Sequence, residues 1–215
     1  MLVEAGRAMR SARLVVAREG NLSVRLAEDR ILITPAGVDK GRLSPAELVE
    51  IDLAGRVHGP GRASVEAPMH LEIYRRRPEA GAVAHGHPVH ATAFAVAGRA
   101  LDACLLPEVI LSLGCVPLVP YATPATDELP AAIGPTCETH DAFLLQNHGA
   151  VAVGPDPARA VEALETVERL AEITWLAEAL GGARPLAREH VERLMQLRKD
   201  AGLTDPLPDC HSADD

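Results

Sequence analysis

Apolar residues recur along this chain with two spacings, one typical of helices and the other of strands. From Val161 to Leu180 they return every three or four positions, which predicts a long amphipathic helix. Asp156-Pro157 supplies a cap and a first-turn proline at its start, and Gly181-Gly182 ends it. Further helices are predicted at 1–18, at 68–77 and at about 186–199.

Short apolar runs between turn residues predict strands at 30–34, 81–87, 142–147 and 150–154. Ser44-Pro45-Ala46-Glu47 has the spacing of a capping box and predicts a short helix before the apolar segment 48–53. Strands and helices mix without a regular βαβ alternation, so we expect an α/β fold with one mixed sheet covered by helices. A single domain should span 1–200, followed by a disordered polar tail at 201–215.

Composition and charge narrow the classes of function. The 215 residues are 47% hydrophobic and 24% charged, as in a globular protein, and no segment approaches the ~18 apolar residues of a membrane span. The formal net charge of −9 argues against nucleic acid as a partner, because phosphate binding needs clustered Lys and Arg. The amphipathic first helix does not look like a signal peptide, so the cytoplasm is the expected compartment.

The segment His85-Gly86-His87 is the strongest chemical signal in the chain. In a strand, residues i and i+2 point to the same face, so the two imidazoles would lie side by side. Buried imidazoles without partners are costly, and a metal ion would satisfy their nitrogens. His148, which precedes Gly149, is a third candidate. Three histidines with an open fourth position are typical of a catalytic zinc site.

Glu66 and His70 form a competing pair of candidates. They are four residues apart, so they could share a helix face and bind metal together. Alternatively, Glu66 only complements the dipole of the helix that starts near Pro68. The positions of Glu66 and His70 in the sequence do not decide between metal binding and the helix-dipole role. The turns at 20–23 and 34–37 offer backbone N–H groups to an anion, a weak signal when taken singly.

Six segments, taken together, resemble the class II aldolase/adducin family. They are GNLSVRL (20–26), ILITPAG (31–37), SVEAPMHLEIYRRRP (64–78), AVAHGHPVHATA (82–93), PYAT (120–123) and LLQNHGAVAVG (144–154), in the order and spacing of the family. The resemblance covers about residues 1–200. It implies a three-layer α/β/α domain with a central, mainly antiparallel sheet, assembled as a homotetramer with active sites at subunit interfaces.

The resemblance also assigns roles to individual residues. It implies one Zn2+ per chain, or another divalent metal, held by three imidazoles: His85, His87 and His148. Glu66 would be the proton-transferring carboxylate, which leaves His70 a structural or supporting role. Tyr121 would act in the site of a neighbouring subunit.

An anionic small-molecule substrate would bind to turns near the metal, where this chain departs from the family. The matching positions are Gly20, Asn21, Gly37 and Ser64. Ala36 and Val65 replace hydroxyl residues, however, and Arg18-Glu19 stands where small or hydroxyl residues are usual. Arg18 could bind the anion in their place, because one guanidinium can replace several hydroxyls. A second tyrosine of the family falls near Ala201, and the sequence does not show what replaces it.

The expected activity is that of a zinc-dependent aldolase, a carbon–carbon lyase that cleaves a small ketose phosphate or a related hydroxy-keto substrate through an enediolate. A metal-dependent decarboxylase is the main alternative, because lost hydroxyls weaken the case for a phosphate site. Sugar-phosphate epimerases and dehydratases share the scaffold, but the epimerase usually carries Asp at position 66. A non-catalytic, adducin-like binding module would lack the three histidines.

Overall fold

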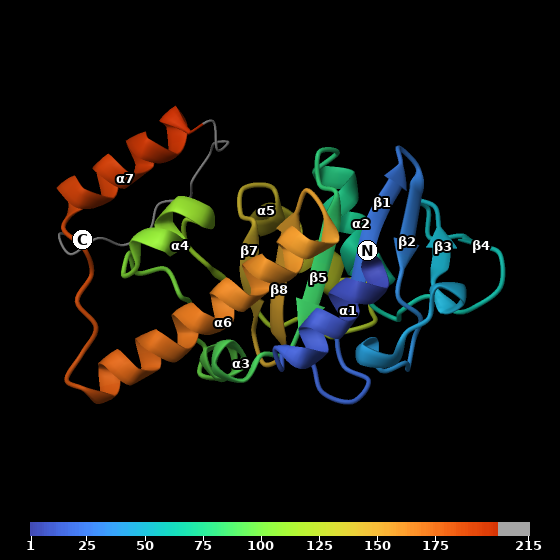
Figure 1. Ribbon diagram of the computed structural model, residues 1–215, viewed down its shortest axis with the longest axis horizontal. Helices are drawn as coiled ribbons and strands as arrows, with labels where there is room; N and C mark the ends of the chain where they lie inside the picture. The colour runs from blue at the N-terminus through green and yellow to red at the C-terminus, as the bar shows by residue number, and fades with distance from the viewer. Residues whose placement is uncertain (202–215) are drawn as a thin grey trace.

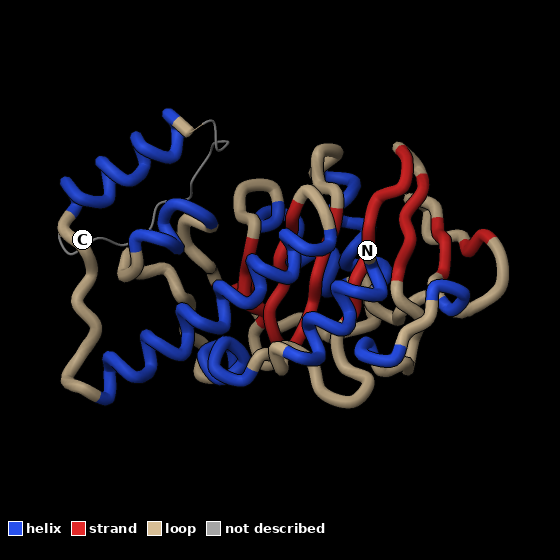
Figure 2. Tube along the Cα trace, viewed as in Figure 1, coloured by secondary structure: helices blue, strands red, loops and turns tan. Residues whose placement is uncertain are grey.

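An eight-stranded sheet runs through the centre of the molecule, in the order β4-β3-β2-β1-β5-β8-β7-β6 (Figures 1 and 2). All neighbouring strands are antiparallel except β6 and β7, so the predicted mainly antiparallel sheet is confirmed. The strands are β1 (Asn21–Ala27), β2 (Arg30–Ile33), β3 (Val49–Ile51), β4 (Val57–His58), β5 (Ala82–Gly86), β6 (Leu118–Val119), β7 (Ala142–Leu145) and β8 (Gly149–Gly154).

Helices cover both faces of the sheet and form the two outer layers (Figure 1). One face carries α1 (Leu2–Ser11), α3 (Val89–Val96) and α6 (Pro157–Ala179). The other carries α2 (Ala67–Arg76) and α5 (Glu128–Cys137). Beyond β6, α4 (Pro107–Ser112) packs against α7 (Arg188–Asp200). Two 3-10 turns complete the chain, η1 (Lys40–Arg42) and η2 (Pro45–Glu47).

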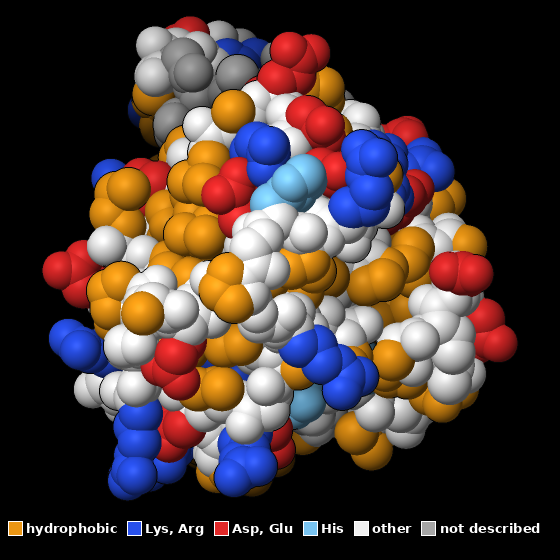
Figure 3. Space-filling model, turned by 90° about the vertical axis from the view of Figure 1, so that its right-hand side faces the viewer, with side chains coloured by type: hydrophobic (Ala, Val, Ile, Leu, Met, Phe, Trp, Pro, Cys, Tyr) orange, Lys and Arg blue, Asp and Glu red, His pale blue; other side chains and the backbone are white. Residues whose placement is uncertain are grey.

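The computed structural model describes residues 1–201, so the tail predicted at 201–215 lies outside the described residues except for Ala201. Within the described range, no helix has the length and apolar character needed to cross a membrane. Seen from the side of β3 and β4, acidic and basic side chains are interspersed with hydrophobic ones (Figure 3).

Side chains alternate between the two faces of the central strands, and the two cores that result differ in the size of their side chains. Alanines such as Ala82, Ala84 and Ala152 face the layer of α6, and their small size lets the long helix lie close to the sheet. The opposite face carries larger side chains, including Val83 and Val151, which pack against α2 and α5. Position 85 continues the second set, so His85 points to the α2 side of the sheet.

Strand register places polar residues on that same face. Asn21 of β1 lies opposite His85 of β5, and Ser23 lies opposite Val83. Asn21 and Ser23 therefore point toward α2 together with His85. The sequence reading of residues 20–23 as a turn is wrong for Asn21 and Ser23, because hydrogen bonding to β2 and β5 draws both into β1.

The first helix is shorter than the predicted 1–18 and ends at Ser11. Arg13 and Ala17 have positive φ angles of 60° and 50°, which an α-helix does not allow. The turn that results buries Leu14, whose carbonyl accepts a hydrogen bond from the backbone N–H of His87 at 2.9 Å. The irregular segment thus supports the residue that follows β5.

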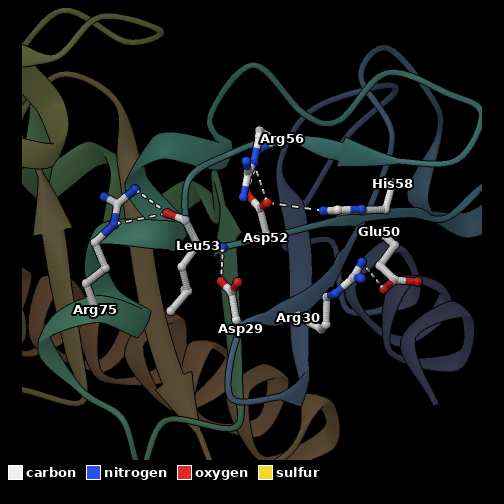
Figure 4. Close-up of polar contacts among 8 residues, drawn as sticks. All are labelled: Asp29, Arg30, Glu50, Asp52, Leu53, Arg56, His58 and Arg75. Atoms are coloured by element: carbon white, nitrogen blue, oxygen red, sulfur yellow. Dashed lines mark hydrogen bonds and ion pairs between the residues drawn. The ribbon is translucent and has the colours of Figure 1, made fainter.

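The loop between β3 and β4 is closed by the buried carboxylate of Asp52 (Figure 4). It accepts hydrogen bonds from the Arg56 backbone at 2.9 Å, from Arg56 Nε at 2.8 Å and from His58 at 3.1 Å. The hydrogen bond from the Arg56 backbone is the main reason why the pKa of Asp52 lies well below its ordinary value. Arg75 of α2 also donates to the Leu53 carbonyl, at 2.6 Å, and so joins this edge of the sheet to α2.

Candidate metal centre

Three imidazoles from adjacent strands converge at one end of the sheet. His85 lies in β5, His87 just after it, and His148 in the turn that precedes β8. Their ring centroids are 5.0 Å (His85–His87), 4.7 Å (His85–His148) and 5.1 Å (His87–His148) apart. One nitrogen from each ring lies within 4.8 Å of the others. The residues singled out in the sequence as metal ligands are therefore brought together by the fold.

Two glycines allow this convergence. A Cβ on Gly149 would lie 2.4 Å from the Gly86 carbonyl oxygen and 2.6 Å from Cδ2 of His87. A Cβ on Gly86 would lie 2.6 Å from the Leu14 carbonyl oxygen. Asn147 takes a left-handed conformation (φ 58°), which Asn tolerates better than most residues, and so turns the chain between β7 and β8. The sequence indicated the turn through Gly149 but did not single out Asn147.

The protonation of His85 suits a metal ligand. Its Nδ1 lies 3.0 Å from the Ala150 carbonyl oxygen, to which it donates, and this leaves the lone pair of Nε2 facing the other two rings. Burial lowers the pKa of His85 to about 3, so the imidazole is neutral at neutral pH. Burial lowers the pKa of His87 as well.

The three-histidine cluster fits a tetrahedral metal. Nε2 of His85 and Nε2 of His87 face each other at 3.2 Å. Two nitrogens bound to one zinc at about 2.0–2.1 Å in tetrahedral geometry would be about 3.3 Å apart. Neutral imidazoles so close, with their lone pairs aimed at one point, are well suited to share a cation.

Glu66 places its carboxylate beside this cluster from the N-terminus of α2. Oε1 lies 3.1 Å from Nε2 of His148, and Oε2 lies 3.4 Å from Nε2 of His85. Oε2 also accepts a hydrogen bond from Nδ2 of Asn21 at 2.6 Å. Burial alone would raise the pKa of Glu66, but His85, His148 and Asn21 more than reverse this and hold it well below its ordinary value. The carboxylate is therefore ionised at neutral pH.

His70 lies outside the cluster of three histidines. It is fully buried, with Nδ1 2.7 Å from the Ser23 hydroxyl and Nε2 hydrogen-bonded to Oδ1 of Asn21. Burial lowers its pKa to about 4, so this imidazole too is neutral. The alternative in which Glu66 and His70 bind one metal together has no support in this geometry, because Asn21 lies between them.

The turns expected to bind a substrate anion lie beside Glu66. The backbone N–H of Ser64 donates to the Thr34 carbonyl at 3.1 Å, which joins the Gly37 turn to the Ser64 segment. Oγ of Ser64 accepts from the Glu66 backbone at 3.3 Å, and Gly37 is exposed with a φ of 71°. Gly20 instead packs its backbone against the His85 carbonyl, where a Cβ would lie at 2.5 Å.

Arg18 and Tyr121 have exposed side chains, and the fold does not draw them into the cluster. The Tyr121 side chain is 58% exposed, and its backbone N–H donates to Gln146 Oε1 at 3.0 Å. The Arg18 carbonyl accepts from the buried Lys40 ammonium at 3.2 Å. Lys40 also donates to the Val38 carbonyl at 2.6 Å, so it ties the two turns of the anion site together. Nothing in the sequence pattern singled out Lys40.

The chain is similar to known proteins in both sequence and structure. The family profile "Class II Aldolase and Adducin N-terminal domain" matches residues 1–175. The chain is 33% identical over 207 residues to 5-methylthioribulose-1-phosphate/5-deoxyribulose-1-phosphate aldolase of Rhodospirillum rubrum, covering 96% of this chain and 93% of the relative. It is also 33% identical over 178 residues to 3-oxo-tetronate 4-phosphate decarboxylase of Haemophilus influenzae, covering 80% and 84%. The solved structure of an L-fuculose 1-phosphate aldolase superposes with a TM-score of 0.85 at 31% identity, covering 92% and 94%.

Replacing Gly149 by Ala should weaken metal binding. The added Cβ meets backbone and the His87 ring, so His87 must shift, and overpacking of this kind costs about 1–3 kcal/mol. Zinc titration against a competing chelator, together with thermal unfolding, measures both effects. Gly37→Ala is the matched control, since its Cβ meets no atom within 4 Å and only backbone strain is added. Equal zinc affinity in Gly149→Ala and the wild type would contradict this account.

The buried His70 should make stability depend on pH between about 4 and about 6.5. Its pKa is about 4 in the folded protein and about 6.5 in the unfolded chain, so the unfolded chain binds the extra proton in this window. Stability therefore rises with pH across the window and falls on acidification, by up to about 3 kcal/mol. Urea unfolding at intervals from pH 4 to pH 7.5 measures the slope. His70→Gln should reduce the slope by the share of His70 while the buried His85 keeps its own, and an unchanged slope in that variant would assign the titration elsewhere.

Proposed function

The chain belongs to the class II aldolase and adducin family, and from that premise we propose that it is a zinc-dependent aldolase that cleaves a small ketose phosphate. One observation carries the proposal: three imidazoles and one ionised carboxylate converge at a single point. We assign His85, His87 and His148 as the metal ligands. Glu66 is assigned the proton transfer.

Bound zinc would act as a Lewis acid that stabilises the enediolate left when the carbon–carbon bond breaks. The proton transfers are assigned to residues of the chain. In the cleavage direction, the hydroxyl next to the breaking bond loses its proton and becomes the aldehyde carbonyl. A proton must then reach the carbon of the enediolate. The ionised Glu66 carboxylate takes up one proton, equivalent to the one that the hydroxyl released, and is assigned its delivery to that carbon. In the reverse direction the ionised Glu66 carboxylate removes that proton, as a general base.

An anionic group on the substrate is proposed to bind at the Gly37 turn and Ser64. The Ser64 hydroxyl accepts from the Glu66 backbone, so its own O–H remains a donor. Asn21 uses one N–H of its amide on Glu66 and has a second to offer. Arg18, with its exposed side chain, supplies positive charge near this position. The relatives reported above carry phosphate in the names of their substrates, which supports a phosphorylated substrate.

A decarboxylase is the second candidate, and the Haemophilus influenzae relative favours it specifically. Cleavage of a ketose 1-phosphate releases an aldehyde and the enediolate of dihydroxyacetone phosphate. Loss of CO2 from 3-oxo-tetronate 4-phosphate leaves the same enediolate. The site near zinc would be identical for both reactions, and only the region that accepts the departing fragment would differ.

A substrate panel distinguishes the two candidates. Zinc-loaded protein is incubated with 5-deoxyribulose 1-phosphate, L-fuculose 1-phosphate and 3-oxo-tetronate 4-phosphate, and released dihydroxyacetone phosphate, aldehyde and CO2 are measured separately. We expect aldehyde and dihydroxyacetone phosphate in equal amounts from a ketose 1-phosphate. CO2 release as the faster reaction would replace the aldolase assignment by the decarboxylase. No reaction with any phosphorylated substrate would contradict both.

Glu66→Gln should retain zinc and lose turnover. The three imidazoles remain in place, so about one metal ion per chain is expected in the variant, as in the wild type. Loss of the proton-transferring group should lower kcat by about 10² or more. Metal analysis and steady-state kinetics test both parts, with His85→Ala, His87→Ala and His148→Ala as variants that should lose metal. Full metal occupancy in these three would refute the ligand assignment, and a near wild-type rate in Glu66→Gln would refute the proton-transfer role.

We further propose a homotetramer in which Tyr121 reaches the site of a neighbouring subunit. Its 58% exposure in the single chain leaves the phenol free to do so. Sedimentation analysis at micromolar concentration should show a tetramer, and Tyr121→Phe should lower kcat without changing metal content. A fully active monomer would contradict this assembly. The cytoplasmic location stays a prediction.

A further inference from the structure

Four buried polar side chains link Glu66 to the interior of the domain. Asn21 donates from Nδ2 to Oε2 of Glu66 at 2.6 Å, and Oδ1 of the same amide is hydrogen-bonded to Nε2 of His70. Nδ1 of His70 lies 2.7 Å from the Ser23 hydroxyl, which in turn lies 2.9 Å from the Tyr74 hydroxyl. None of the four is more than 2% exposed.

Regular secondary structure holds this chain of contacts in place. Glu66, His70 and Tyr74 recur every fourth position and therefore lie on one face of α2 and its N-cap. Asn21 and Ser23 alternate along β1 and point to that same face. Two elements thus interleave their polar side chains, and no flexible loop takes part.

The hydrogen bonds can run in only one direction. Asn21 gives an N–H to the carboxylate, so its carbonyl oxygen faces His70 and needs a donor. His70 must then carry its proton on Nε2, and the neutral ring accepts at Nδ1. The Ser23 hydroxyl has to donate to Nδ1, which leaves its oxygen to accept from Tyr74. Burial raises the pKa of Tyr74, so its hydroxyl remains a donor.

We propose that His70, Ser23 and Tyr74 are positioning residues, a one-way series of donors that keeps Nδ2 of Asn21 on Oε2 of Glu66 and leaves Oε1 as the oxygen that carries the proton. The inference rests on the proposed role of Glu66. Among the described residues, Oε1 has one polar neighbour at short range, Nε2 of His148 at 3.1 Å, and that nitrogen is assigned to the metal. Oε1 is therefore the carboxylate oxygen that no donor of the chain occupies.

The Glu66 carboxylate fixes the tautomer of His70 through Asn21, and Ser23 supplies the donor that matches it. If His70 carried its proton on Nδ1, its Nε2 would accept and the Asn21 amide would have to turn around. The amide oxygen would then face a carboxylate oxygen at the present 2.6 Å separation, which is repulsive. Removing the Ser23 hydroxyl leaves the Nδ1 lone pair of His70 without its donor.

Nitrogen-15 NMR of the histidine rings in the full zinc-loaded protein tests the direction without reference to catalysis. We expect His70 to be the Nε2–H tautomer in the wild type. An Nδ1–H tautomer in the wild type would overturn the proposal, whether or not a substrate has been identified.

Kinetics of matched variants test the positioning role. His70→Leu and Ser23→Ala should lower kcat by about tenfold to a hundredfold, the usual effect of losing a residue that orients a site group, with zinc content unchanged. His70→Gln offers an amide N–H to Asn21 and an acceptor to Ser23, so it should recover most of the rate. Thr174→Val, which removes a buried hydroxyl from α6 on the other face of the sheet, is the control.

The outcomes separate this inference from the proposed function. Unchanged kcat in His70→Leu, or a loss in His70→Gln as large as in His70→Leu, overturns the positioning role. If the wild type has the Nε2–H tautomer but Glu66→Gln is fully active, the direction of the hydrogen bonds is supported and the role of Glu66 is refuted. Should Ser23→Ala fail to fold, the wild-type tautomer and the pair of His70 variants still decide the question.

Discussion

Gly149, at the start of β8, packs its backbone against Gly86, at the end of β5. A Cβ on Gly149 would come within 2.4 Å of the Gly86 carbonyl, so β8 cannot carry a side chain at this position. This contact fixes the spacing between His87, which follows β5, and His148, which precedes β8. Antiparallel pairing of β5 and β8 supplies the register, and the glycines supply the missing volume. The geometry of the three-histidine cluster is thus a property of backbone packing.

Burial then gives the side chains their chemical states. Desolvation penalises the charged form of an imidazole, so His85 and His70 stay neutral and act through lone pairs and single N–H groups. The same desolvation would protonate Glu66, but direct contacts with Asn21, His85 and His148 outweigh it. Neutral ligands and an ionised base can therefore exist side by side at neutral pH.

The local sequence pattern predicted those elements that are defined by residue spacing and turn residues. The two histidine segments and the capped helix α6 were read correctly, since spacing and turn residues define them. No helix was predicted at α3 or α5. Residues of α3 are apolar on nearly every side, so they lack the alternation of an amphipathic helix, and α5 contains Pro135. The hydrogen bonds of His70 depend on the pairing of β1 with β5, a long-range contact. Such contacts leave no periodic signal in a single sequence.

Whether the chain is an aldolase or a decarboxylase depends on the region that accepts the leaving fragment, not on the metal ligands. Both candidate reactions deliver the same enediolate, so the histidines and Glu66 are equally suited to either. What differs is the fragment that leaves, a neutral aldehyde or CO2 derived from a carboxylate. A carboxylate needs positive charge or N–H donors before it departs, whereas an aldehyde needs an acid or base at its oxygen. Arg18 and Tyr121 offer these two properties, and both side chains lie at the surface of the single chain. In the proposed assembly, the reaction is decided where a neighbouring subunit completes the site.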